Sequence, residues 1–255
     1  MNDIALQLYT VRNQLSEDVR GTLRKIANSG YRSVETAGYA GLNPEEFYQI
    51  VRDEGLRAVS SHVGWQRLEQ DLASVIREAQ ASDVPTIVLP SLPPQYRASE
   101  ERYAGAAATM NQWGSALRRA GHEFLYHNHA FEFEELPSQR SGFDVLREQT
   151  DSEVVGFEVD IYWVVKAHRN ALQLLKELGD RVSLMHVKDI GPPPEEKDLP
   201  VGDGLMPWPE VLSGGSLRCF IVEQDHVWGD DVFQDIQTSW TNLNRLLAPT
   251  RPGMN

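Results

Sequence analysis

The feature that most limits how this chain can fold is a regular alternation of short strand-like runs with longer helical patterns. Eight runs rich in β-branched and aromatic residues recur along the chain, at 4–9, 33–37, 58–63, 86–90, 123–128, 154–160, 182–189 and 219–225. Helical spacing fills the intervals, near 17–29, from Asn43 and Pro44 onward, and near 66–82, 99–120, 142–149, 169–178 and 230–247. Strands that alternate with helices in this way indicate parallel βαβ units.

Such units could form either of two architectures, a closed barrel or an open doubly wound sheet. Eight units in 255 residues match the (β/α)₈ TIM barrel, whose usual length is about 250 residues. An open sheet normally shows a glycine-rich phosphate loop after its first strand, whereas the segment 7–12 contains no glycine. We therefore predict an α/β fold, a TIM barrel forming a single domain over residues 1–255, with 248–255 as a flexible tail. Several predicted helices end at a glycine just before a strand, namely Gly30, Gly55, Gly121 and Gly179.

The charge balance argues against several classes of partner. The chain has 37 acidic and 24 basic side chains, a formal net charge of −13, whereas nucleic-acid binding requires clustered Lys and Arg. No apolar stretch approaches the roughly 20 residues of a membrane span, and the N-terminus lacks the basic region of a signal peptide. The single cysteine, Cys219, cannot form an internal disulfide. We therefore expect a cytoplasmic protein with neither a nucleic-acid nor a membrane partner.

Ionisable side chains stand at the C-terminal ends of the predicted strands. In a TIM barrel the active site forms at that end, because the βα loops converge there. Random surface charge would not place so many ionisable groups at equivalent points of successive units. The residues concerned are Glu35, His62, His127, His129, Asp160, His186 and Glu223.

Three of these residues, Asp160, His186 and Glu223, come from consecutive strands and form a mixed carboxylate–imidazole set. Such a set suits a divalent ion such as Mn²⁺, Co²⁺, Mg²⁺ or Zn²⁺. Taken singly, Asp160 could cap the following helix, His186 could be a core histidine, and Glu223 could be solvated. Their shared position on the strands favours a metal site. If Asp160 points inward, so does Glu158, a buried carboxylate whose partner the sequence does not name.

Motifs in the expected order carry a resemblance to a known family. They are QLYTVR, SVETAGYAG, YHNHAFEF, FEVDIYWV, HVKD, VGDG and FIVEQDH. The chain resembles the xylose isomerase-like TIM-barrel superfamily of sugar phosphate isomerases and epimerases, over about residues 4–247. Ketose 3-epimerases, inosose dehydratase, 3-dehydroshikimate dehydratase and endonuclease IV belong to it. The resemblance implies the fold and a metal site, while its members differ in their reactions.

The resemblance also implies a ligand set, from which this chain departs at one position. In the ketose epimerases the metal is held by a Glu, an Asp, a His and a Glu from strands five to eight. Asp160, His186 and Glu223 match the last three. His127 stands where the family has the first glutamate, and we favour it as the fourth ligand. Glu132, five residues on, is the alternative if its loop folds back.

The departure affects the chemistry, because an imidazole nitrogen bound to a metal is not free to move a proton. The epimerases exchange a proton between two glutamates on opposite faces of the substrate. If His127 binds the metal, the second acid–base group must be another residue, with His129, Glu132 and Lys188 as candidates. We take Glu223 as the base, with His129 and Lys188 as further catalytic candidates. Proposed substrate contacts are Glu35, His62, Glu132 and Trp163.

These inferences predict a divalent-metal-dependent isomerase or epimerase of a small ketose, inosose or keto-sugar, acting through an enediolate that the metal stabilises. The alternative is a dehydratase or lyase, resembling inosose dehydratase or a keto-glycoside eliminase or hydrolase, which needs only one base. An endonuclease IV-like nuclease would require basic DNA-contacting loops, and a non-enzymatic binding module would not need three aligned ligands. No basic cluster for phosphate stands out, so we expect a non-phosphorylated carbohydrate. The oligomeric state stays open, with a homo-oligomer suggested only by analogy with other such barrels.

Overall fold

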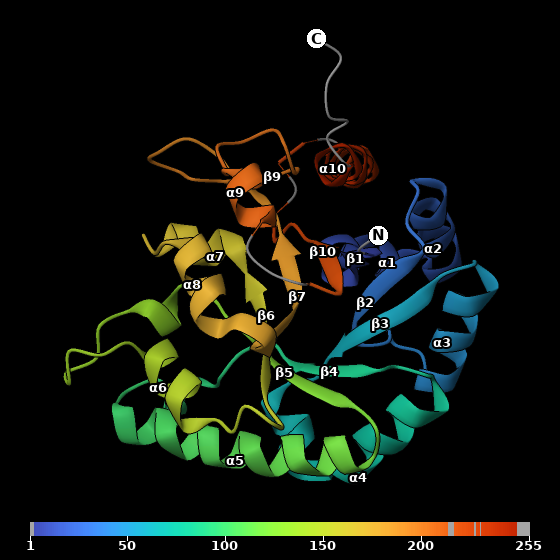
Figure 1. Ribbon diagram of the computed structural model, residues 1–255. Coiled ribbons are helices and arrows are strands. Elements are labelled where there is room, and N and C mark those ends of the chain that lie inside the picture. The colour runs from blue at the N-terminus through green and yellow to red at the C-terminus, as the bar shows by residue number, and fades with distance from the viewer. Residues whose placement is uncertain (1–2, 214–216, 227, 230, 249–255) are drawn as a thin grey trace.

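Eight parallel strands close into a barrel that helices surround on the outside (Figure 1). The computed structural model describes residues 3–213, 217–226, 228–229 and 231–248, and the expected flexible tail from 249 onward lies outside them. The strand order is β1-β10-β7-β6-β5-β4-β3-β2, which confirms the predicted TIM barrel. The strands are β1 (Asp3–Gln7), β2 (Ser33–Ala37), β3 (Arg57–His62), β4 (Thr86–Leu89), β5 (Glu123–His127), β6 (Gly156–Asp160), β7 (Val182–Val187) and β10 (Cys219–Val222).

Seven helices occupy the segments with predicted helical spacing. They are α2 (Val19–Asn28), α3 (Pro44–Asp53), α4 (Trp65–Ala81), α5 (Glu100–Arg119), α6 (Gly142–Gln149), α8 (Ala171–Leu178) and α10 (Val232–Leu247). Asn43 caps α3 by accepting a hydrogen bond from the Glu46 amide, and Pro44 is its first residue, as the sequence predicts. The glycines at the predicted helix stops all have positive φ. At Gly30 a side chain would also collide with the ring of Trp240.

Several short elements were not predicted. The segment expected as one helix at 17–29 is preceded by a separate helix α1 (Arg12–Glu17), because Asp18 is extended and caps α2 through the Gly21 amide. The other additions are α7 (Ile161–Lys166), α9 (Trp208–Leu212), the hairpin of β8 (Asp189–Ile190) and β9 (Asp198–Leu199), and the 3₁₀ turns η1 (Leu8–Val11), η2 (Pro94–Tyr96), η3 (Phe131–Phe133) and η4 (Gly179–Arg181). Such short elements carry too few residues to show a hydrophobic period.

The inside of the barrel is layered, because alternate side chains of every strand point inward. The middle layer is apolar and consists of Ala5, Val59, Val88, Leu125, Leu184, Cys219 and Ile221. Polar side chains lie on both sides of it along the strands. At the N-terminal end, Asp3 accepts a hydrogen bond from Ser33 and pairs with Arg57. The polar groups at the C-terminal end form the candidate site.

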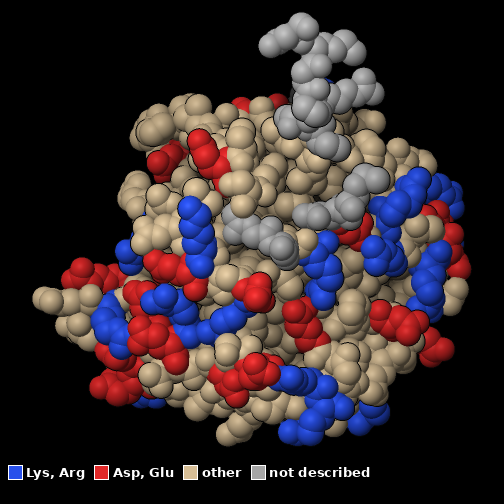
Figure 2. Space-filling model, in the orientation of Figure 1, with Lys and Arg blue, Asp and Glu red and all other residues tan. Residues whose placement is uncertain are grey.

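The outer surface carries both signs of charge. On the face shown in Figure 2, acidic and basic side chains are interspersed over the surface helices. In the part of the chain that the structure describes, no helix has both the length and the hydrophobicity that crossing a bilayer would require.

Candidate functional site

Four ionisable side chains from neighbouring strands meet at the C-terminal end of the barrel. His127 ends β5, Asp160 ends β6, His186 lies in β7, and Glu223 directly follows β10. All four are buried, and each offers a nitrogen or oxygen atom within 4.8 Å of those of the other three. The structure therefore brings together the ligand set that the sequence favoured, and this cluster could hold a metal ion.

Glu132, the alternative fourth ligand, lies outside that cluster. It sits in the turn η3, where its carboxylate accepts hydrogen bonds from the hydroxyl of Tyr126 and from the amide of His129, the latter at 2.8 Å. Burial raises the pKa of Glu132 to about 8. The 3₁₀ turn thus directs this carboxylate onto its own segment rather than toward the other ligands.

The two carboxylate oxygens of Asp160 make different contacts. Oδ1 accepts a hydrogen bond from the amide of Trp163 at 3.2 Å and so caps α7. Oδ2 faces the cluster, 3.8 Å from Nε2 of His127 and 2.9 Å from Nζ of Lys188. Burial raises the pKa of Asp160 to about 6 against the opposing effect of Lys188. The helix cap and the place in the cluster are therefore compatible.

Lys188 is the only lysine or arginine among these buried groups, and three carboxylates surround it. Its Nζ lies 2.9 Å from Asp160, 2.8 Å from Glu223 and 2.7 Å from Asp225. Burial by itself would lower the pKa of Lys188, but the carboxylates outweigh burial and hold that pKa well above its ordinary value. Lys188 is therefore a charged ammonium that forms ion pairs with all three carboxylates, two of which belong to the candidate ligands Asp160 and Glu223.

Beneath these residues lies a second layer that contains Glu35 and Glu158. Oε1 of Glu158 is 3.0 Å from His127 Nδ1, 2.9 Å from His62 Nε2 and 3.0 Å from His186 Nε2. Oε1 of Glu35 is 2.6 Å from His186 Nε2 and 3.0 Å from His62 Nε2, and it accepts a hydrogen bond from Gln7 at 2.8 Å. The three imidazoles are thus the partners of Glu158 that the sequence could not name.

The imidazoles differ in their protonation. Burial, together with the neighbouring His186, holds the pKa of His127 well below its ordinary value, so this ring is neutral. Burial would also lower the pKa values of His186 and His62, but the adjoining glutamates raise the first well above normal and the second to about 10. A neutral imidazole is the form that binds a metal ion, so His127 has the required form and His186 would have to lose a proton on binding.

A cavity of about 310 Å³ opens beside the cluster. Its lining combines aromatic, imidazole and carboxylate groups: Tyr9, Ala37, His62, Pro90, His127, His129, Glu223 and Asp225. Burial lowers the pKa of His129 to about 4, so this side chain is neutral. Trp163 packs against His129 with ring centroids 5.6 Å apart. Glu35, Glu132, Trp163 and Lys188, which the sequence also proposed for the site, do not line this cavity.

Three residues of this region were not predicted as site residues from the sequence. Tyr9 is 43% exposed at the cavity and has the Arg12 guanidinium stacked 4.0 Å from its ring centroid. Asp225 binds Lys188, and Gln7 binds Glu35. Strand alternation offered a signal for two of them, because Asp225 stands two residues after Glu223, and Gln7 is an isolated polar residue near the end of the first strand run.

The cluster has the charge that a cation site requires. The two layers hold four buried carboxylates, which face Lys188 and the protonated imidazoles of His62 and His186. Two of the carboxylate oxygens have no hydrogen-bond donor among the described residues. These atoms are Glu35 Oε2 and Glu158 Oε2, whereas Asp160 Oδ2 lies 2.9 Å from Nζ of Lys188. Buried anionic groups are stable only when paired or bound to a cation. The side chains present therefore fit a divalent ion.

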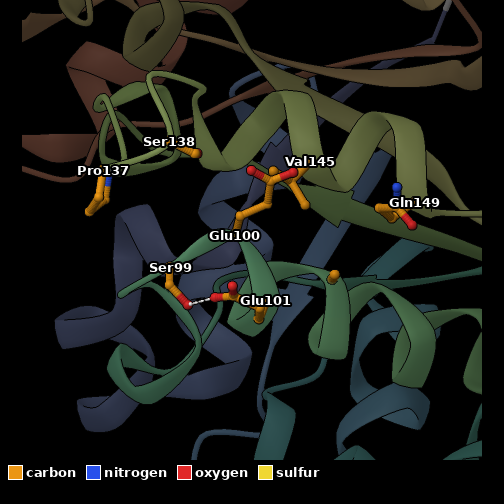
Figure 3. A pocket seen from close by; sticks show the side chains of 8 residues that line it. Ser99, Glu100, Glu101, Pro137, Ser138, Val145 and Gln149 are labelled. Carbon is orange, nitrogen blue, oxygen red and sulfur yellow. Dashed lines mark hydrogen bonds between the residues drawn. The ribbon is translucent and has the colours of Figure 1, made fainter.

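Another cavity, of about 420 Å³, lies outside the barrel between the start of α5, the loop at 137–138 and α6 (Figure 3). Ser99 donates a hydrogen bond to Glu101 there at 2.8 Å. The described residues that line this cavity include neither histidine nor cysteine. It offers no mixed ligand set like that at the barrel mouth.

Comparison with known proteins identifies one family, a curated relative and several similar solved structures. The family model described as xylose isomerase-like TIM barrel matches residues 23–214. An inosose dehydratase of Clostridium perfringens is 28% identical over 96 residues, which are 38% of this chain and 31% of that protein. The match thus spans about a third of the curated relative.

Solved structures share the fold over nearly the whole chain. A sugar phosphate isomerase/epimerase from Parabacteroides distasonis is 23% identical, with a TM-score of 0.80 over 97% of this chain and 94% of that one. A D-allulose 3-epimerase from Methylomonas sp. is 14% identical, with a TM-score of 0.73 over 96% and 98%. At these identities the likeness establishes the fold alone.

Proposed function

The chain belongs to the xylose isomerase-like TIM barrel family, and on that premise we propose that it is a divalent-metal-dependent enzyme that isomerises or epimerises a small ketose, inosose or keto-sugar. The observation that carries this proposal is the convergence of His127, Asp160, His186 and Glu223 beside a cavity of about 310 Å³. Buried mixed ligands next to a cavity of this size are typical of a catalytic site.

His127, Asp160, His186 and Glu223 would hold the cation. When bound, a divalent ion supplies a Lewis acid that polarises a substrate carbonyl and acidifies the adjacent carbon. Glu223 is the proposed base, because it lines the cavity and is ionised. Burial would raise the pKa of Glu223, but Lys188 and His186 hold it well below its ordinary value. Its Oε2 contacts His186 and Lys188, which leaves Oε1 as the atom proposed to take the proton.

A second acid–base group is harder to assign, and this supports elimination as the alternative reaction. Epimerisation requires a proton donor on the other face of the substrate. His129 lines the cavity but is neutral, and Glu132 is turned away from it. His62, which lines the cavity and carries a proton because the glutamates raise its pKa to about 10 against burial, is the remaining donor. A dehydratase could work with Glu223 alone, which would take the α-proton and return it to the departing hydroxyl as water leaves, in keeping with the sequence similarity to inosose dehydratase.

The substrate is proposed to carry no phosphate. Among the described residues, the cavity lining contains two carboxylates, Glu223 and Asp225, and neither lysine nor arginine. Phosphate recognition normally uses arginine, lysine or a helix N-terminus. A dianionic group placed here would meet like charge, so a neutral polyol with a ketone or aldehyde fits the lining better. Tyr9 offers an apolar wall against one sugar face.

The experiment is metal analysis of the purified protein, followed by a screen of ketoses, inososes and keto-sugars in D₂O with products identified by NMR. Deuterium incorporated into substrate or epimer identifies the isomerase, and an unsaturated or dehydrated product identifies the lyase. Turnover that survives chelation of all divalent metal would contradict the metal-dependent proposal. Binding of sugar without turnover in the metal-loaded protein would instead support a binding module.

A further inference from the structure

Two glutamates beneath the candidate ligands have no place in the chemistry proposed above. Glu35 on β2 and Glu158 on β6 are completely buried, and neither lines the cavity. Each nevertheless contacts a ring nitrogen of a candidate ligand, and Glu158 contacts two, on His127 and on His186. Oε1 of Glu158 lies 3.0 Å from Nδ1 of His127, and Oε1 of Glu35 lies 2.6 Å from Nε2 of His186.

These contacts select opposite nitrogens on the two rings. A metal-bound neutral imidazole keeps its proton on the nitrogen that does not face the ion. A carboxylate beside one nitrogen holds the proton there and leaves the other nitrogen free to bind. His127 then presents Nε2, which lies 3.8 Å from Asp160 Oδ2. On His186 a carboxylate lies beside each nitrogen, with Glu35 Oε1 2.6 Å from Nε2 and Glu223 Oε2 2.9 Å from Nδ1. Because Glu223 is itself a candidate ligand, the cation would lie on the Nδ1 side.

We propose that Glu35 and Glu158 are positioning residues that fix the tautomers of the two imidazoles, so that His127 binds the cation through Nε2 and His186 through Nδ1. This inference rests on the proposed metal-dependent function. Carboxylates that accept a hydrogen bond from a ligating histidine orient its ring and strengthen its binding. Here His62 also links the two glutamates, with Nε2 at 3.0 Å from Glu35 and 2.9 Å from Glu158.

The described residues offer one competing arrangement, which predicts the opposite choice of nitrogens. His62, His127, Glu158 and His186 also offer atoms within 4.8 Å of one another. An ion in this deeper group would lie against His127 Nδ1 and His186 Nε2, the nitrogens that face Glu158. The two positions share both imidazoles, and an imidazole that bridged two ions would have to lose both protons. Only the shallower position includes Glu223, the carboxylate that lines the cavity.

The test is a long-range ¹H–¹⁵N correlation spectrum of the zinc-loaded protein labelled with ¹⁵N-histidine. The chain has seven histidines, and His127→Gln and His186→Gln would assign the two signals. We expect a protonated Nδ1 and zinc-bound Nε2 for His127, and the reverse for His186. Zinc on the opposite pair of nitrogens, zinc on the same nitrogen of both rings, or no zinc binding would overturn the inference. Turnover of the same sample reports on the function separately.

A variant series tests whether the glutamates cause this pattern. Glu158→Met removes the acceptor, and we expect zinc affinity, measured by competition with a chelator, to fall by about 10–100-fold. Glu158→Gln keeps an acceptor oxygen and should lose less. Glu123→Gln, a carboxylate at the other end of the barrel, is the matched control and should bind zinc normally. If Glu158→Met does not fold, Glu35→Met is read in the same way. Folded variants with unchanged tautomers and affinity would overturn the positioning role.

Discussion

The two ends of the barrel are both polar, but they handle charge in opposite ways. At the N-terminal end two carboxylates have arginine partners, with Asp3 paired to Arg57 and Glu123 to Arg218. These arginine side chains are 67% and 48% exposed. At the C-terminal end, by contrast, several buried carboxylates have as their partners one buried lysine, Lys188, and three imidazoles. The same alternation of strand residues therefore gives partly exposed, locally neutral pairs at one end and a buried network of carboxylates, imidazoles and one lysine at the other.

This difference supports the proposal that the C-terminal end carries the chemistry. Exposed ion pairs contribute little and cost little, about 0–1 kcal/mol each. Buried charges carry a desolvation cost that well-packed apolar residues of similar volume would avoid. The apolar middle layer shows that this chain can fill its barrel with such residues. The charges kept buried at the C-terminal end therefore support the proposed cation site and reaction, because stability alone would favour apolar residues there.

The largest expected effect separates the two ends by turnover. Glu223→Gln removes the proposed base and the negative charge of one candidate metal ligand. We expect activity to fall by about 1,000-fold, within the range for loss of an acid–base group. Glu123→Gln makes the same chemical change at the N-terminal end and should retain normal activity. Steady-state kinetics with the substrate found in the screen would measure both. Near-normal turnover in Glu223→Gln would remove that residue from the mechanism.

The next largest effect is on the free energy of unfolding of the metal-free protein. Lys188→Met leaves the carboxylates of Asp160, Glu223 and Asp225 without their cation, and breaking such a buried set costs about 3–5 kcal/mol. Arg218→Met at the other end removes a half-exposed charge and should cost about 1 kcal/mol or less. Urea unfolding of the metal-free proteins gives both numbers. Equal losses in the two variants would contradict the contrast between the ends.

The sequence predicted the fold and most of the cluster because both depend on local patterns. Alternating strands and helices predict the barrel, and a polar residue after an apolar strand predicts a position at the mouth. Asp160, His186 and Glu223 followed from that rule alone. The choice between His127 and Glu132 did not, because it depends on the turn η3, which directs Glu132 onto Tyr126.

The second layer could not be predicted, for a different reason. The partners of Glu158 come from β3, β5 and β7, and contacts among three separate strands depend on barrel closure and register. The register shifts between Phe157 and Glu158 and between Val34 and Glu35, so counting residues along a strand would misplace both glutamates. Strand alternation identified Glu158 as buried, but its neighbours required the three-dimensional structure.

A smaller effect is the stabilisation that a bound cation adds. At a free concentration of Mn²⁺ or Zn²⁺ one hundred times its dissociation constant, the free energy of unfolding should rise by about 2.7 kcal/mol. Asp160→Asn should lose most of this increment, because it removes a ligand charge. Glu123→Gln should keep it in full. Unfolding curves with and without metal measure the difference, and an increment that Asp160→Asn retained would place the ion elsewhere.

The smallest effect tests the N-terminal end directly. Arg57→Met removes the exposed partner of Asp3, which retains its hydrogen bond from Ser33 at 2.6 Å. We therefore expect the free energy of unfolding to change by about 1 kcal/mol or less, and the change to shrink further at 1 M salt, where surface charges are screened. Zinc affinity and turnover should match those of the wild-type protein, because the apolar layer separates Arg57 from the cluster. A loss of zinc affinity in this variant would mean that the two ends are coupled through the barrel, and that the contrast drawn between them does not hold.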